Sequence, residues 1–497
     1  MSAFVWTDAR VRRALGLRME HAEEGIEYAG VSTDSRTTQK DDLYVALVGE
    51  RFDGHDFVAD ALSRGARGAV VSHPAAGDPS NVRLYPVDDT LVALGMLAYH
   101  RRQALDAPVV AITGSSGKTT TKDMVAAALA ATRRVHATEG NLNNRIGMPL
   151  TVLTVPDDAE AVVLELGTNE PGEIATLAQI ARPDIAVITT VGESHLEKLG
   201  SVEGVFEEKL QILRHMSDGG RCVVGDEPAG LPERARKLCS RVRVVGWSER
   251  ADETGRPGHP DVDVFGKYAF DWRGERVTAP MVGRHGVTNA LLALTIAELL
   301  GVGAKDAVRG LANTERRALR TEFRRIGDLT LIVDCYNANP QSVRASLDVL
   351  EAQGVAARKV AVLGSMLELG DASASLHMEV LADALGRDVD LVVATGAFAD
   401  AAQGGGADKA SDADRLITGS EWSEAYPRLS DRLEGDEIVL LKASRGVALE
   451  GILPLLEDDF GGEGSLSRKG SETPEGSESR AGSESRAGSE AADGEES

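Results

Sequence analysis

Cysteine, aromatic residues and lysine are all scarce in this chain of 497 residues. Three cysteines cannot build a disulfide framework, and none lies in a C-x-x-C motif, so a reducing, cytoplasmic compartment is expected. No run of about 18 apolar residues occurs, which argues against a membrane-spanning helix. The first residues also lack the apolar core of a signal peptide.

Basic residues are also in deficit, with 54 Lys and Arg against 78 Asp and Glu, a formal net charge of −24. Phosphate backbones and anionic membranes both attract basic surfaces, so we expect neither nucleic acid nor a membrane as a partner. Only 12 of the 54 basic residues are lysines. The length itself, at roughly 150 residues per domain, suggests about three domains.

The chain divides into three expected α/β domains and a tail. Residues 1–106 mix short apolar strands with turn residues and one helical stretch. In 107–318 and again in 319–460, apolar strand-like runs alternate with helical segments, which is typical of parallel sheets covered by helices. The segment 461–497 consists mainly of Gly, Ser and Glu with almost no apolar residue, so we predict that it is disordered.

A Gly-rich loop follows the first apolar strand of the central domain and opens a helix. In such a loop, backbone N–H groups cradle phosphate, Lys118 reaches the β and γ oxygens, and Thr119 can hold Mg²⁺. The cradle comprises Gly114, Ser115, Ser116, Gly117, Lys118, Thr119 and Thr120. Ile112 stands where the strict motif has Gly, so a chance Gly/Ser turn is the alternative. We predict a nucleoside triphosphate site.

Two further polar residues follow the next two strands of the same domain. Glu165 ends one strand and His195 lies in the loop after the other. Ligands of parallel sheets bind at the carboxyl ends of the strands, so both residues are candidate metal or phosphate contacts. The alternatives are a solvated strand-end Glu and an ordinary surface His. Lys209 lies beside Glu207 and Glu208 on a helix, and such a run of charged residues usually forms a solvent-exposed helix face.

Three loops further along the chain have the composition of binding loops. Arg284 and His285 precede an apolar helix, and Asp334-Cys335-Tyr336-Asn337-Ala338-Asn339-Pro340 follows an apolar strand. Lys442 and Arg445 flank Ser444 after the last strand, and cations before a helix oppose its dipole, which favours an anionic ligand. Helix caps and an Asx-turn are the alternative readings of these loops.

Taken together and in order, TGSSGKTT, ELGTN, the His195 loop, GRHGVTNA, DCYNANP and LKASRG resemble the Mur ligases of bacterial peptidoglycan synthesis. The N-terminal VSTDSR and FDGHDF, with GNLNNRIGMPLTVL and YNANP, are similar to the member that joins D-alanyl-D-alanine to UDP-MurNAc-tripeptide. The resemblance runs from about Val31 to Leu456. It implies a P-loop-type central domain, a Rossmann-like C-terminal domain that swings onto ATP, and a soluble monomer.

The resemblance implies that ATP converts the tripeptide carboxylate into an acyl phosphate, which the dipeptide amine then attacks. Lys118, Glu165, His195 and Lys209 would be catalytic, with Lys209 carrying a carbamate. Thr119, Glu165, His195 and Lys209 would hold two Mg²⁺ ions. Asn289, Arg320 and Asp334 would contact the nucleotide. The UDP end would meet Thr33, Asp34, Ser35, Arg36, Asp53, Gly54 and His55. The peptide and the dipeptide would meet Asn141, Asn143, Asn144, Thr168, Asn169, Asn337, Asn339, Lys442, Ser444 and Arg445.

Three rival functions stay open at this point. The first is another Mur-type ligase or a folylpolyglutamate synthetase, which would use the same phosphate loop and metal ligands. The second is a P-loop NTPase that is not a ligase, although such a protein would carry an Asp where this chain has Glu165. The third is a non-catalytic relative that only binds the tripeptide.

Overall fold

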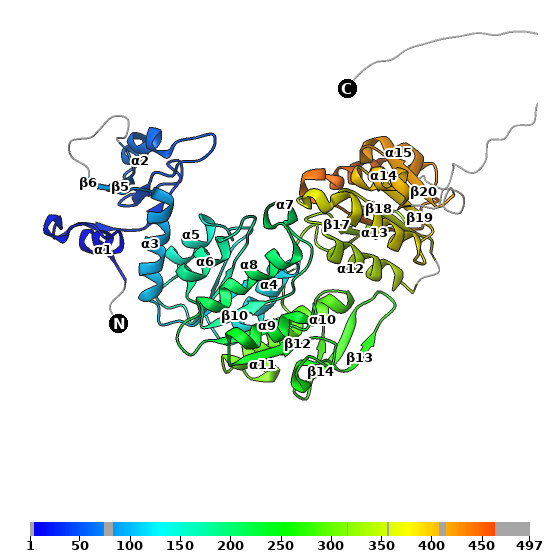
Figure 1. Ribbon diagram of the computed structural model, residues 1–497, viewed down its shortest axis with the longest axis horizontal. Coiled ribbons are helices and arrows are strands. Elements are labelled where there is room, and N and C mark those ends of the chain that lie inside the picture. The colour runs from blue at the N-terminus through cyan, green and yellow to red at the C-terminus, as the bar shows by residue number, and fades with distance from the viewer. Residues whose placement is uncertain (1–3, 74–82, 316, 355–356, 407–413, 463–497) are drawn as a thin grey trace, which may run out of the picture.

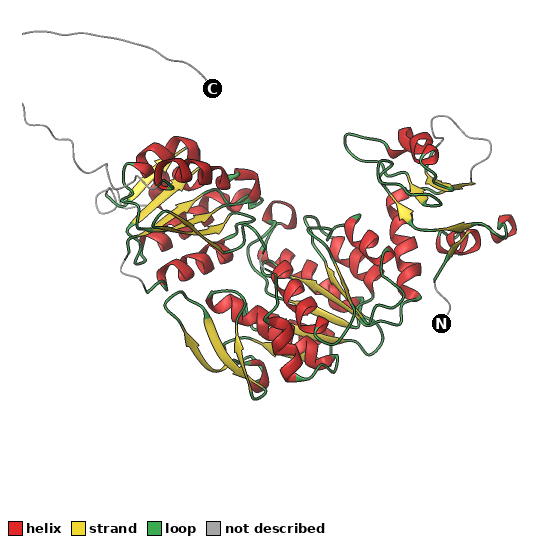
Figure 2. Cartoon of the chain, turned by 180° about the vertical axis from the view of Figure 1, so that it is seen from behind, coloured by secondary structure: helices red, strands yellow, loops and turns green. Residues whose placement is uncertain are grey.

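The structure is a computed structural model that describes residues 4–73, 83–315, 317–354, 357–406 and 414–462. The tail predicted to be disordered therefore lies outside the described residues, except for its first two. Three α/β lobes follow one another along the chain, from the N-terminal lobe through the central lobe to the C-terminal one (Figure 1). The same order is seen from behind (Figure 2). Among the described residues, no helix has both the length and the apolar character needed to cross a membrane.

The N-terminal lobe is built on a four-stranded parallel sheet. Its strands are β3 (Val31–Ser32), β4 (Leu43–Val45), β5 (Gly68–Val71) and β6 (Arg83–Pro86), paired in that order. A two-stranded ribbon, β1 (Trp6–Thr7) and β2 (Glu27–Tyr28), flanks helix α1 (Asp8–Ala14). Helix α2 (Val58–Ser63) packs on the sheet, and the long helix α3 (Thr90–Gln103) connects the lobe to the central one (Figure 1).

The central lobe contains a six-stranded, wholly parallel sheet in the order β12-β11-β10-β7-β9-β8. The strands are β7 (Val109–Thr113), β8 (Val135–Ala137), β9 (Ala161–Glu165), β10 (Ile185–Ile188), β11 (Arg221–Gly225) and β12 (Val242–Val245). Because β7 lies between β9 and β10, the phosphate loop, Glu165 and the loop carrying His195 meet at one sheet edge. That placement is what the carboxyl-end rule predicted from the sequence.

Helices cover both faces of the central sheet, which explains why its strands are apolar throughout. Val110 and Ile112 of β7 pack with α4 (Lys118–Ala130) and α10 (Gly283–Leu299). Val109 and Ala111 face the other side, where α6 (Glu173–Ala181) and α8 (Val202–Arg214) lie. The remaining helices are α5 (Gly147–Leu153), α7 (Leu196–Leu199), α9 (Gly230–Leu238) and α11 (Ala304–Leu311).

A small antiparallel sheet beside the central lobe was not foreseen from the sequence. It consists of β13 (Gly258–Val262), β14 (Tyr268–Trp272) and β15 (Glu275–Thr278). Only Phe270, Trp272 and Val277 are buried, so its alternation of apolar and polar residues is short and weak. Such a pattern does not stand out among loop sequences.

The C-terminal lobe has a six-stranded sheet in the order β16-β17-β21-β18-β19-β20, in which only β16 is antiparallel. Its strands are β16 (Glu322–Ile326), β17 (Leu329–Asp334), β18 (Lys359–Leu363), β19 (Leu391–Thr395), β20 (Leu416–Gly419) and β21 (Ile438–Lys442). Helices α12 (Pro340–Glu351) and α13 (Ser373–Leu385) cover one face, and α15 (Trp422–Ser430) and α16 (Ile452–Phe460) the other. Asp334 and Lys442 are cross-strand neighbours in this sheet.

Candidate active site

A cleft of about 940 Å³ lies between the central and C-terminal lobes. The phosphate loop and the carboxyl ends of β9 and β10 form one wall, and the loops after β17 and β21 form the other. The predicted residues that line it are Ser115, Ser116, Gly117, Lys118, Thr119, Thr120, Asn141, Asn143, Asn144, Glu165, Thr168, Asn169, His195, Asn289, Arg320, Asp334, Asn337, Asn339 and Lys442. Most of the predicted set is therefore brought together.

The phosphate loop is folded so tightly that two of its residues must be glycine. Gly114 has φ +152°, and a Cβ there would lie 2.0 Å from the Thr189 hydroxyl oxygen. Gly117 has φ +79°, and its Cβ would lie 2.8 Å from Oδ1 of Asn289. Close backbone approach at these points leaves the loop N–H groups at the start of α4, where a helix attracts anions. Asn289 packs directly on this loop.

Lys118, the first residue of α4, lies at the cleft wall with its ammonium group folded back on the loop. Its Nζ donates a hydrogen bond to the carbonyl oxygen of Gly114 over 2.8 Å. Burial lowers the pKa of Lys118, and the carboxylate of Glu165 only partly opposes that shift. An ammonium group in this setting lacks an adequate counter-charge, which a phosphate group would supply.

Glu165 has one satisfied and one unsatisfied carboxylate oxygen. Thr119 donates its hydroxyl to Oε1 over 3.2 Å, and the amide of Asn143 donates to the same atom over 2.7 Å. Oε2 is buried and has no hydrogen-bond partner among the described residues. Buried carboxylate oxygens without a partner are costly, so this atom marks a place for a cation. Oxygen donors of this kind suit Mg²⁺.

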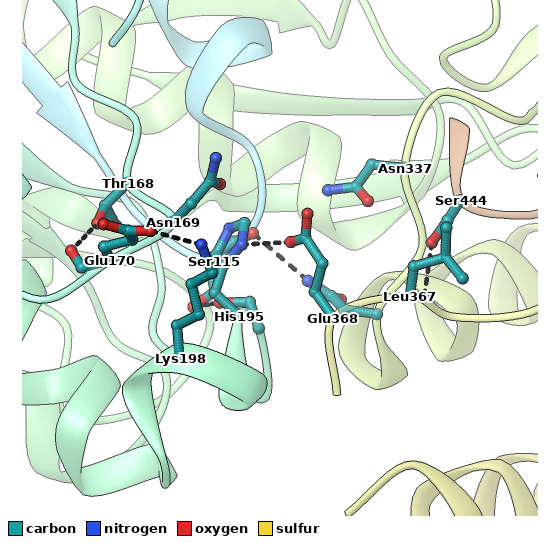
Figure 3. A network of polar contacts seen from close by, with 12 residues as sticks. Ser115, Thr168, Asn169, Glu170, His195, Lys198, Asn337, Leu367, Glu368 and Ser444 are labelled. Carbon is teal, nitrogen blue, oxygen red and sulfur yellow. Dashed lines mark hydrogen bonds and ion pairs between the residues drawn. The ribbon is translucent and has the colours of Figure 1, made fainter. Parts of the chain in front are cut away.

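His195 is engaged by a residue of the other lobe. Its Nδ1 lies 2.5 Å from Oε2 of Glu368, and the two side chains face each other across the lobes in Figure 3. Burial lowers the pKa of His195, while the hydrogen bond to Glu368 opposes that shift. Nothing in the sequence pattern singled out Glu368. Glu368 lies in the loop after β18, and β18 is the neighbour of β21 in the sheet. The rule that ligands bind at the carboxyl ends of parallel strands could therefore have pointed to this loop.

Lys209 is not on a solvated face, and the composition-based alternative is wrong. Its side chain is 0% exposed, and its Nζ has no hydrogen-bond partner among the described residues. Burial first, and then the charge of Lys118, lower the pKa of Lys209 well below its ordinary value. The adjacent Glu208 is also buried, accepting the backbone N–H groups of Gly172 and Ile174 over 2.7 Å each. Glu208 thereby caps the start of α6, and the apolar residues of α8 pack in the same core.

The C-terminal wall adds cations to the cleft. Arg320 donates to the hydroxyl of Thr119 over 3.2 Å, and its guanidinium carbon lies 3.9 Å from the centre of the Tyr336 ring. Lys442 donates to Oδ2 of Asp334 over 2.7 Å and to the carbonyl oxygen of Asn337 over 2.8 Å. Burial would raise the pKa of Asp334, but Lys442, together with the Ser346 hydroxyl and His285, outweighs burial, and the pKa lies below its ordinary value.

Breaking the Asp334–Lys442 pair should destabilise the C-terminal lobe. Lys442→Met leaves the Asp334 carboxylate, whose side chain is only 14% exposed, without its cation, so we expect the free energy of unfolding to fall by about 3–5 kcal/mol. Urea denaturation of the full chain measures this. Arg445→Met is the matched control, because Arg445 is 59% exposed beside Glu450 and an exposed pair contributes at most about 1 kcal/mol. Equal losses in the two variants would contradict the expectation.

Of the residues predicted on the central and C-terminal lobes, three besides Lys209 do not line the cleft. Gly114 begins the phosphate loop and accepts the hydrogen bond from Lys118. Ser444 holds two loops together, accepting from the Leu367 N–H over 3.0 Å and donating to the Ala338 carbonyl oxygen over 3.3 Å. Arg445 is turned to Glu450. Ser444 thus braces the two loops behind the C-terminal wall of the cleft and does not face the cleft.

The residues expected at the UDP end form a separate group on the N-terminal lobe and do not line the cleft. Asp34 and Arg36 make an exposed ion pair with oxygen and nitrogen 2.6 Å apart. Asp53 binds Nδ1 of His55 over 2.6 Å, and Nε2 of His55 accepts the N–H of Ser72 over 2.9 Å. Both ring nitrogens of His55 are used, so the cluster of Asp53, His55 and His73 offers no complete metal site. Thr33, Ser35 and Gly54 lie in the same two loops.

The phosphate loop, its buried carboxylate and the cationic wall of a second lobe are features of an ATP-dependent ligase, and the chain belongs to the Mur ligase family. Its three lobes match the models for the Mur ligase family catalytic domain (residues 27–102), the Mur ligase middle domain (112–297) and the Mur ligase glutamate ligase domain (319–445).

Among the members of that family, the chain is similar to UDP-N-acetylmuramoyl-tripeptide–D-alanyl-D-alanine ligases. It is 37% identical to the one from Bacillus subtilis (strain 168), covering 85% of this chain and 92% of the relative. It is 33% identical to the one from Escherichia coli (strain K12), covering 87% and 95%. The crystal structure I of MurF from Acinetobacter baumannii superposes with TM-score 0.82 at 31% identity, covering 92% of this chain and all of that one.

MurF ligase from Thermotoga maritima in complex with ADP superposes with TM-score 0.74 at 27% identity, covering 87% of this chain and 97% of that one. That protein was crystallised with the nucleotide that ATP-dependent ligation leaves behind. The sequence-based predictions of a Mur ligase and of three α/β lobes are confirmed by the family models and by these structures.

Proposed function

We propose that the protein joins D-alanyl-D-alanine to UDP-N-acetylmuramoyl-tripeptide at the expense of ATP, releasing ADP and phosphate. The observation that carries the proposal is the meeting of two walls in one cleft. Lys118 and Glu165 of the central lobe face Arg320 and Lys442 of the C-terminal lobe, and Arg320 donates to Thr119 across the gap. The substrate pair follows from the likeness to ligases of that name at up to 37% identity.

The reaction proceeds in two displacements. A carboxylate oxygen of the tripeptide attacks the γ-phosphorus, the bond to the ADP oxygen breaks, and an acyl phosphate forms. The dipeptide amine then attacks the carbonyl carbon, phosphate leaves with the C–O electron pair, and the amine loses a proton. The loop N–H groups and Lys118 bind and orient the phosphates, and Arg320 and Lys442 offset the negative charge that develops. Closure of the two walls excludes water from the acyl phosphate.

The residues present fit Mg²⁺. Oε2 of Glu165 is a buried oxygen without a partner, and the Thr119 hydroxyl lies beside the same carboxylate. We propose that these two residues, with His195, hold two ions. When bound, Mg²⁺ would neutralise charge on the phosphate oxygens.

The Lys209 side chain has the properties of a residue that is covalently modified. Its amine is buried and has no hydrogen-bond partner among the described residues, and burial lowers its pKa, which favours the neutral, nucleophilic form. We propose that its nitrogen bonds to the carbon of CO₂ and releases a proton, which converts the side chain into an anionic carbamate able to serve as a metal ligand.

The remaining predicted residues keep their proposed roles, supported by where they lie. Asn289, Arg320 and Asp334 would bind the nucleotide. Asn141, Asn143, Asn144, Thr168 and Asn169 line the cleft on the side proposed for the muramoyl-peptide. Asn337, Asn339 and Lys442 would meet the dipeptide, with Ser444 bracing their loop and Arg445 next to it. The group from Thr33 to Arg36, with Asp53, Gly54 and His55, would receive the UDP end.

We further propose that the domains divide between α3 and β7, at 106–107, and between α11 and β16, at 318–319, with a disordered tail from 461. The protein would act as a monomer in the cytoplasm, where ATP is available, with no nucleic-acid partner. Size-exclusion chromatography with light scattering tests the monomer.

Phosphate release tests the function itself. With ATP and UDP-MurNAc-tripeptide, we expect release to depend on added D-alanyl-D-alanine, because water is excluded from the acyl phosphate. Single amino acids serve as the control acceptors, and mass spectrometry identifies the product. Equal release with water or a single amino acid as acceptor would refute the proposed substrate pair.

A further inference from the structure

Residues 195–197 contact a segment of the C-terminal lobe, residues 366–370, through two hydrogen bonds. Nδ1 of His195 lies 2.5 Å from Oε2 of Glu368, and the backbone N–H of Glu197 donates to the Glu368 carbonyl oxygen over 3.1 Å. Figure 3 shows the His195 ring turned to the Glu368 carboxylate from the opposite ribbon. Because the two residues belong to different lobes, the contact exists only while the lobes are docked.

The segment 366–370 is held firmly within its own lobe. The N–H of Met366 donates to Nε2 of the buried His377 over 2.9 Å, and the N–H of Leu367 donates to the hydroxyl of Ser444 over 3.0 Å. Across the lobe boundary, Gly370 lies so close to Glu197 that a Cβ on Gly370 would be 2.8 Å from the Cα of Glu197. The backbone that carries Glu368 is therefore fixed within its lobe, while the side chain itself is 53% exposed and is held by His195.

The backbone at both ends of the contact is unusual. His195 has φ +54° and Glu368 has φ +64°. Residues other than glycine rarely adopt this conformation, and they keep it where the surroundings enforce it, often at functional sites. Two such residues in contact across a lobe boundary indicate that the fold specifically maintains this contact.

We propose that Glu368 is a positioning residue that fixes the ring of His195, so that Nε2 of His195 is presented to the cleft only when the C-terminal lobe is docked. Histidines that bind metals almost always donate their other ring N–H to a carboxylate or carbonyl group. Here Nδ1 is committed to Glu368, which leaves Nε2 as the ligand atom. The inference rests on the proposed function and couples lobe docking to the completeness of the metal site.

Binding of Mn²⁺ to the full chain, with a non-hydrolysable ATP analogue present, tests this by electron paramagnetic resonance. We expect Glu368→Ala to weaken Mn²⁺ binding by about 10-fold or more, the usual effect of removing such a partner. Glu368→Gln keeps an oxygen that accepts the Nδ1 proton and should lose less. Asp371→Ala is the matched control, because Asp371 is an exposed carboxylate directly after this segment and its loss should leave binding unchanged.

A double-mutant cycle separates positioning from mere structural support. With His195→Ala already in place, adding Glu368→Ala should cause no further loss of Mn²⁺ binding. Unchanged or tighter binding in Glu368→Ala alone, or a full further loss in the His195→Ala background, would overturn the proposal. Wild-type protein that binds Mn²⁺ but does not ligate D-alanyl-D-alanine would instead refute the proposed function, so the two failures are distinguishable.

Discussion

Replacing Lys118 with methionine is expected to lower kcat/KM for ATP by about 10²–10³-fold, the usual effect of removing one charged donor from a transition state. The side chain keeps its volume, but the phosphates lose the ammonium group that now rests 2.8 Å from the Gly114 carbonyl oxygen. ADP formation at varied ATP concentration measures the effect. A loss in kcat as well as in affinity is expected, because charge on the transferred phosphoryl group grows in the transition state.

Lys198→Met is the control for Lys118→Met. Lys198 lies in the same region but is exposed and pairs with Glu170, as Figure 3 shows. Its replacement should leave kcat/KM within about threefold of the wild type, since exposed ion pairs contribute little. If the two variants behaved alike, Lys118 would not be the residue that grips ATP.

Replacing Lys209 with methionine should abolish most of the activity while leaving the fold at least as stable as before. The amine is fully buried without a partner, so its removal relieves a desolvation cost. Activity should fall by about 10²–10³-fold, because the proposed anionic ligand is lost. Wild-type activity should also fall in CO₂-depleted buffer and recover with bicarbonate, whereas the variant should not respond.

The stability gain in Lys209→Met should itself depend on pH. The pKa of Lys209 is depressed in the folded protein, so in the wild type the unfolded chain binds the extra proton and stability rises with pH up to about 10.4, the ordinary lysine value. The variant lacks this dependence. In bicarbonate-free buffer, the difference in the free energy of unfolding between the wild type and Lys209→Met should therefore narrow as the pH rises. Normal activity in Lys209→Met would contradict the carbamate.

The parallel sheets were predictable because both their faces are covered, which makes each strand a continuous apolar run such as β7 or β21. From those runs the carboxyl-end rule placed Lys118, Glu165 and His195 together before any geometry was known. The antiparallel sheet β13–β15 escaped prediction because it buries few side chains. The apolar pattern of a sequence predicts a strand well only where the strand buries many of its side chains.

The site was less predictable where one residue's role depends on a distant partner. Lys209 looks solvated beside Glu207 and Glu208, yet it is fully buried, and its neighbour Glu208 accepts a hydrogen bond from the Ile174 N–H, 34 residues back along the chain. Glu368 bonds to His195 across 173 positions. No window of sequence contains both members of either pair. Similarity to a family suggested a role for Lys209, and only the packed lobes disclosed Glu368.

Because the cleft is divided between two lobes, its two walls are synthesised one after the other. The chain emerges from the ribosome with the phosphate loop first, and Lys442 follows Lys118 by 324 residues (442 − 118). At roughly 5–20 residues per second, the second wall appears on the order of 15–65 s after the first. A nascent central lobe therefore carries an ATP cradle without Arg320, Lys442 or the partner of His195. Synthesis of the last lobe, and not of the nucleotide site, is the event that turns the chain into an enzyme.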